Sequence, residues 1–263
     1  MSFYWIYEIP NWAFCALCIV VFAALSAGGV VVTRGVVRRV FGPQGSNDIV
    51  SYFLSATGVF YGITLGLIAI GAWQNFDSVS GRVSREAAAV AMVCQDVAAM
   101  PESAEKTAVN DAIKEYLRYV IEEAWPLQRK GVVPTGGAER FMMIHRRILA
   151  IEPKTETDKI VLAEMISRIN TALEARRLRL EAVTSGLPAL LYWIVLLGGF
   201  INVSITWCFV MERLKAHMLL CGAIGALIGL LIFMVAAMDN PFRGEYSVGP
   251  SAFELIQQRY FGQ

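Results

Sequence analysis

Residues 52–73 of the chain are YFLSATGVFYGITLGLIAIGAW, a stretch without a single charged side chain. Residues 12–33, 188–211 and 218–238 share this character. Each stretch has about 20 residues, and at about 1.5 Å of rise per residue such a helix crosses a hydrocarbon core about 30 Å thick. The sequence therefore predicts four transmembrane helices.

The composition agrees with a membrane protein. Hydrophobic residues make up 56% of the 263 residues and charged residues only 17%, whereas a soluble domain averages about 25% charged residues. The formal net charge is +1, so no basic excess points to nucleic acid. We expect the lipid bilayer as the partner and a multi-pass protein of the cell inner membrane.

A polar middle segment separates the apolar stretches into two pairs. We therefore expect an all-α integral membrane protein with four transmembrane helices in two hairpins and a central extramembrane helical stalk. The predicted domains are a first hairpin at 1–75, the stalk at 76–186, a second hairpin at 187–240 and a C-terminal tail at 241–263.

The stalk carries apolar residues at alternating steps of four and three, which is typical of helices that pack on helices. We expect the second span to continue as one helix to about Met100, because no terminator follows Trp73. Further helices are expected at 102–125, before Pro153, and at 155–186, the last entering the third span. The stripe after the second span consists of Val83, Ala87, Val90, Cys94 and Val97.

The orientation in the membrane has two opposing indications. The loops between paired spans carry Arg34, Arg38, Arg39, Arg213 and Lys215, and the positive-inside rule places such loops in the cytoplasm. The stalk and both termini would then lie outside. The family resemblance described below implies the reverse orientation, with the stalk and both termini in the cytoplasm.

The second span has glycines at every fourth position, which places them along one helix face. Small residues let helices in lipid pack tightly. The alternative is that this helix lines a pore, with bulky neighbours forming an apolar constriction that gates by dewetting. The candidate pore-lining residues are Gly58, Phe60, Gly62, Ile63, Gly66 and Leu67.

No Asp, Glu, Lys, Arg or His lies within the core of any span. Proton pumps and ion-coupled carriers place such residues there, so passive conduction, or no conduction, is expected. The charged run at 174–181, EARRLRLE, is interpreted as a solvated face, or alternatively as a positive ring at a pore mouth.

Nothing in the sequence predicts an enzyme, a cofactor or a metal site. Cys15 and Cys18 form a CxxC inside an apolar span without a second pair of ligands, and metal sites need four. His145 and His217 lie far from any motif of catalytic spacing. We interpret these side chains as structural.

The segment after the fourth span is a turn motif. Pro241 cannot continue a helix, Phe242 is a large apolar anchor and Gly244 permits a tight turn. Together with Asp239 and Asn240 these residues are expected to end the span and fold against the stalk.

Several stretches resemble the bacterial bestrophin-like domain family, which is distantly similar to bestrophin anion channels. The likeness covers nearly the whole chain in matching order. It rests on Asn47-Asp48, VFYGITLGL at 59–67, Trp73, Phe76, Arg85-Glu86-Ala87, Tyr116, Glu123-Ala124-Trp125-Pro126, residues 176–180, Gly186-Leu187-Pro188 and residues 239–244.

The resemblance implies a pentameric homo-oligomer whose second span lines an anion pore. It does not imply calcium gating, because only Glu245 follows Gly244 where animal bestrophins have an acidic run. The first hypothesis is therefore passive conduction of anions such as chloride. The rival hypothesis is a non-conducting membrane scaffold or sensor whose stalk binds a partner.

Overall fold

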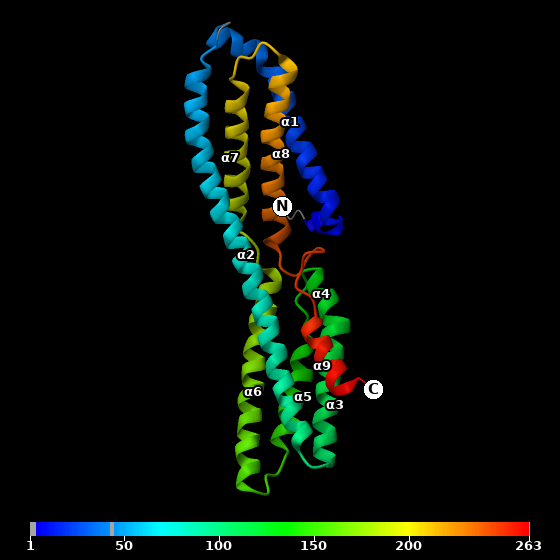
Figure 1. Ribbon diagram of the computed structural model, residues 1–263. Coiled ribbons are helices and arrows are strands. Elements are labelled where there is room, and N and C mark those ends of the chain that lie inside the picture. Colours follow the sequence, from blue (N-terminus) through cyan, green and yellow to red (C-terminus); the bar gives the residue numbers. More distant parts are fainter. Residues whose placement is uncertain (1–3, 43–44, 263) are drawn as a thin grey trace. The chain divides into compact units, whose positions relative to one another are not determined.

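The computed structural model describes residues 4–42 and 45–262; the outermost ends of the predicted first and last domains lie outside this part. No strand occurs in these residues, and the all-α prediction is confirmed. Four helices are long and apolar enough to cross a membrane. They are α1 (Asn11–Phe41), α2 (Asn47–Ala99), α7 (Ala189–Trp207) and α8 (Leu214–Asp239) (Figure 1).

The chain forms two compact units. The first, here called the membrane unit, comprises Met1–Gln74, Gly186–Asp239 and Gly244–Tyr246. The second, here called the helical unit, comprises Asn75–Ser185, Asn240–Arg243 and Ser247–Gln263. The four predicted domains and their boundaries stay a prediction.

In the membrane unit, α1 lies along α8, so the first and last spans pack together (Figure 1). The approach is close because α8 has glycine at the contact. A Cβ atom at Gly225 would lie 2.4 Å from the carbonyl oxygen of Phe22, and one at Gly229 would lie 2.5 Å from that of Cys18. Small residues permit such backbone contact in lipid. The two-hairpin arrangement itself stays a prediction.

The span in α2 packs on α7 through the ring of Tyr61, which lies near the middle of the span. A Cβ atom at Gly198 would meet this ring at 2.7 Å, and the Tyr61 hydroxyl donates to the Val195 carbonyl at 3.1 Å. Leu65 and Ile68 are buried in the same apolar cluster. Only this side of the span in α2 is therefore covered within the protomer.

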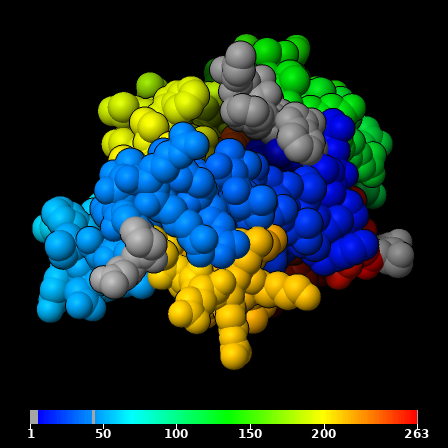
Figure 2. All heavy atoms as spheres, turned by 90° about the horizontal axis from the view of Figure 1, so that it is seen from above, coloured from blue at the N-terminus to red at the C-terminus, as the bar shows by residue number. Residues whose placement is uncertain are grey.

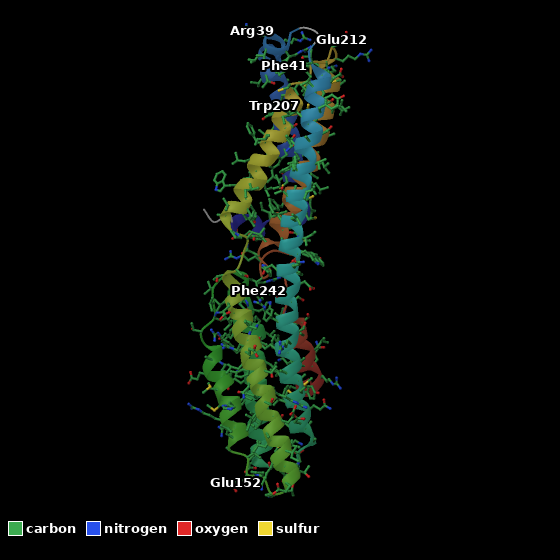
Figure 3. All side chains as sticks on the ribbon, turned by 90° about the vertical axis from the view of Figure 1, so that its left-hand side faces the viewer. Arg39, Phe41, Glu152, Trp207, Glu212 and Phe242 are labelled. Carbon is green, nitrogen blue, oxygen red and sulfur yellow. The ribbon has the colours of Figure 1, made fainter. Side chains whose placement is uncertain are left out.

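The two short connections of the membrane unit meet at one end. The Asn47 side chain donates to the Val210 carbonyl and accepts from the Val210 amide, both at 2.9 Å. Arg39 and Glu212 lie at this end (Figure 3). Figure 2 looks down on it and shows the blue of α1 meeting the yellow-orange of the segment before α8.

The helical unit contains the continuation of α2 and five further helices. The predicted stripe from Val83 to Val97 lies in its core, and each of its members is at most 3% exposed. The Thr155 hydroxyl and Asp158 form a reciprocal capping box that starts α6. The helices are α3 (Ala104–Tyr119), α4 (Trp125–Arg129), α5 (Gly137–Leu149), α6 (Glu156–Glu181) and α9 (Ser251–Phe261).

Two expected helix ends are wrong. Pro126 does not end the second stalk helix, because a π-helical turn at Val120–Ala124 precedes it and Pro126 stands in the first turn of α4, where no intrahelical N–H is needed. The last stalk helix does not run into the third span. A 3₁₀ turn at Ala182–Thr184 and an extended Ser185 intervene before Pro188, the N-cap of α7.

The C-terminal segment packs into the helical unit. Phe253 of α9 is fully buried, and its ring lies 5.8 Å from that of Trp125. Phe242 contacts the same indole edge-on at 5.9 Å. The Trp125 Nε1 donates to the Val248 carbonyl at 3.1 Å, so one indole holds this segment by two rings and a hydrogen bond.

Candidate functional site

All six candidate pore-lining residues lie on α2 and are exposed in the protomer. A Cβ atom at Gly62 or Gly66 would meet nothing within 4 Å, and one at Gly58 would meet only the Asn202 Oδ1 at 3.9 Å. Tight packing of this glycine face therefore does not occur within the protomer. Whether the face lines a pore stays a prediction.

The structure separates the six residues into two strips. Phe60, Ile63 and Leu67 lie at helical spacing, are 59–74% exposed, and occupy the side of α2 opposite Leu65 and Ile68. The glycines lie between this apolar strip and the buried side. Because of this geometry, the bulky strip and the glycine strip cannot both face the same direction.

The polar groups near the span in α2 are neutral. The Asn202 Nδ2 of α7 donates to the Gly198 carbonyl at 2.9 Å, and its oxygen lies near Gly58. The Thr64 hydroxyl donates a hydrogen bond to the Phe60 carbonyl of the same helix at 2.8 Å. An ion on this surface would meet small dipoles and apolar side chains.

The helical unit contains a buried charge cluster that joins four helices. Arg179 of α6 is 1% exposed and donates from Nε and Nη2 to Glu86 of α2 at 2.7 and 3.1 Å. The Tyr116 hydroxyl donates to the same carboxylate at 2.6 Å. Arg179 Nη1 donates to the Gln128 Oε1 at 2.7 Å. Each charge in the cluster is paired and hydrogen-bonded, as buried charges require.

The electrostatics of this cluster follow from its burial. Desolvation raises the pKa of Tyr116 well above its usual range, and the neighbouring Glu86 carboxylate raises it further. Burial alone would lower the pKa of Arg179, but the Glu86 carboxylate raises it overall. The guanidinium also lies 5.2 Å from the centre of the Trp125 ring. It lies 5.8 Å from the centre of the Phe253 ring, so the buried ion pair lies against two aromatic rings.

The interpretation of residues 174–181 as a solvated face is wrong for two of the three arginines. Arg176 and Arg179 are buried, whereas the side chain of Arg177 is 80% exposed and pairs with Glu181. The sequence carried a signal for this. The buried positions Met165, Ile169 and Ala172 continue at the same spacing to Arg176 and Arg179.

One carboxylate paired with one guanidinium does not form an acid–base pair for catalysis, since neither group has access to a substrate. Among the described residues, no group of three or more His, Cys, Asp and Glu is placed to hold a metal ion. The arrangement holds helices together.

The turn motif closes α8. The Asp239 carboxylate is buried and accepts a hydrogen bond from the Leu187 amide at the start of the third span. Gly244 has a φ of +80°, a conformation that favours glycine. Phe242, labelled in Figure 3, is 1% exposed. The motif therefore combines the end of a span, a sharp turn and an anchored ring.

A family model described as the bestrophin-like domain matches residues 20–253. A comparison with curated proteins gave no match. The match includes α1 from residue 20 onward, the whole of α2, α7 and α8, the six α2 candidates and the Glu86–Arg179 pair. The chain is therefore a membrane protein that belongs to the bestrophin-like domain family.

Proposed function

We propose that this protein is a passive anion channel, formed by a ring of identical subunits in the membrane. The observation that carries the proposal is the uncovered face of α2. A Cβ atom at Gly62 or Gly66 would meet nothing within 4 Å, and Ile63 is 59% exposed, in a helix that the bestrophin-like family match covers. A second copy of the chain would cover part of this face and enclose the rest.

The two strips of α2 support different roles in such a ring. The glycine strip allows the helix of a neighbouring subunit to approach closely. Phe60, Ile63 and Leu67 would then face the axis as an apolar constriction, which passes weakly hydrated ions and gates by wetting. The cores of the spans carry no charge that would bind an ion strongly or move a proton.

The rival proposal is a non-conducting scaffold or sensor, and one observation favours it. The helical unit presents an apolar groove of about 790 Å³ between α6 and the loop before α5, lined by Val133, Leu173 and Leu180 among others. Such a surface in a water-exposed unit fits a protein partner. In this alternative the spans would only anchor and assemble the protein.

Chloride efflux from liposomes separates the two proposals. Oligomer verified by cross-linking is reconstituted, and efflux is followed after a chloride gradient is imposed. A channel releases chloride in proportion to the protein incorporated. Liposomes that contain verified oligomer and remain chloride-tight would contradict the channel.

Ile63→Ala provides the matched variant for this assay. Removing a bulky apolar side chain from the constriction widens it and eases its wetting, so efflux should rise several-fold. Ile160→Ala is the control, because Ile160 is 72% exposed on α6 of the helical unit and should leave efflux unchanged. Equal efflux from both variants and the wild type would place Ile63 outside the pathway.

A further inference from the structure

A recess lined by both charged and apolar groups lies between α2 and α6 in the helical unit. It has a volume of about 240 Å³, roughly eight times the ~30 Å³ that one water molecule occupies in the liquid. Its walls include Ser78, Arg82 and Arg85 from α2, and Glu174 and Leu178 from α6. A small polyatomic ion fits into this space together with water.

The two arginines make the recess electropositive. Arg82 Nη1 donates to the Leu178 carbonyl at 3.3 Å, which holds its guanidinium across the gap between the helices. In the described part of the chain, no carboxylate forms an ion pair with Arg82 or Arg85. Glu174 supplies one negative charge against these two positive charges.

Two arginines of α6, by contrast with Arg82 and Arg85 of α2, form ion pairs. Arg168 pairs with Asp96 at 2.7 Å and Arg177 pairs with Glu181 at 2.9 Å. By contrast, Arg82 and Arg85 stand three residues apart on one helix, and like charges at this spacing repel one another. An anion between them would remove this repulsion and accept N–H groups from both.

We propose that the recess between α2 and α6 binds a small oxyanion of the phosphate type through Arg82 and Arg85. Planar guanidinium groups present paired N–H donors that match the oxygens of phosphate or carboxylate better than a spherical halide. The Ser78 hydroxyl offers a further donor. The phosphate group can come from solution or from a lipid headgroup. The site is independent of conduction, because binding needs no ion gradient.

The test is calorimetric titration of the full chain with inorganic phosphate. The protein is held in nanodiscs of neutral phosphatidylcholine at constant ionic strength, because exposed charge interactions are screened by salt. Saturable binding is expected. Arg85→Gln should weaken it about tenfold, since it removes charged hydrogen-bond donors from the site. Arg85 is exposed and forms no ion pair within the described part of the chain, and an unchanged melting temperature verifies that the variant folds normally.

Two further variants test whether the affinity for phosphate follows the charge inside the recess. Glu174→Gln removes the opposing carboxylate and should tighten phosphate binding about two- to threefold. Arg177→Gln removes an arginine of α6 outside the recess and should leave the affinity unchanged. The inference is overturned if the wild type shows no saturable binding, if Arg177→Gln weakens binding as much as Arg85→Gln, or if Glu174→Gln fails to tighten it.

A second arm identifies the source of the phosphate group. Nanodiscs that contain phosphatidic acid are titrated in the same way. Weaker apparent binding of free phosphate there, restored by neutral lipid, assigns the site to a headgroup. Equal binding in both lipids assigns it to a soluble oxyanion. Either result supports the recess as a phosphate site. A failed chloride-efflux assay would contradict the channel proposal but not this inference.

Discussion

At the scale of single residues, the most informative feature is a charged pair placed where the sequence pattern calls for apolar side chains. Glu86 is 0% exposed and Arg179 1% exposed, and each satisfies the other by two hydrogen bonds. A buried ion pair adds little net stability, but removal of one partner leaves an uncompensated charge. The pair therefore fixes how α2 and α6 fit together.

Glu86→Gln should destabilise the helical unit by about 3–5 kcal/mol, because it leaves the Arg179 charge buried without its counterion. Thermal unfolding in detergent measures the loss. Glu181→Gln is the matched control, since it breaks an exposed pair with Arg177 and should cost less than about 1 kcal/mol. Similar losses of unfolding free energy in the two variants would show that the buried ion pair matters no more to stability than the exposed pair.

Tyr116 should make the stability sensitive to alkali. Its folded pKa is raised above the ordinary value of 10.0, so its contribution is complete below pH 10 and is lost as pH rises above that value. Tyr116→Phe removes this titration along with one hydrogen bond. The gap in unfolding free energy between wild type and variant should therefore narrow above pH 10. A gap that stays constant to pH 11 would contradict the raised pKa.

At the scale of the helices, α8 shows why glycines three or four residues apart are not equivalent. Gly225 and Gly229 touch the backbone of α1, whereas a Cβ atom at Gly222 would have ordinary contacts of 3.8 Å. At steps of three and four residues, all three glycines fall on one helix face. Only the register between α1 and α8 decides which of them lie at the crossing.

Gly225→Ala should destabilise the membrane unit by about 1–3 kcal/mol, because the added methyl group forces two helix backbones apart. Gly222→Ala has room for its methyl group and should be nearly neutral. Both effects are measured as shifts in the melting temperature of the detergent-solubilised protein. A larger shift for Gly222→Ala would mean that α1 and α8 cross elsewhere.

Much of the element structure could be predicted from the sequence, since long apolar stretches and apolar stripes follow directly from burial. The end of α2 and the stripe from Val83 to Val97 are examples. The π turn before Pro126 and the break before Pro188 could not be predicted, because both depend on how the chain packs against neighbouring helices. The buried cluster at Glu86 was not predicted. Charged side chains were assigned to the surface, although Arg179 continues the spacing of the buried residues of α6.

At the scale of the whole molecule, the assignment to the bestrophin-like domain family and four apolar helices define a membrane protein. The channel proposal adds that subunits enclose an axis at α2. The sequence predicted the six candidate residues from their pattern, but which strip faces the axis depends on neighbouring subunits. The strips of α2 and the recess at Arg82 are therefore tested by different experiments.

The most direct test of the channel is the current across a planar bilayer that contains the verified oligomer under a tenfold chloride gradient. Selective chloride conduction predicts a reversal potential that approaches the chloride equilibrium value, about 59 mV in magnitude. A reversal potential of the opposite sign, or no current from incorporated oligomer, would contradict the account.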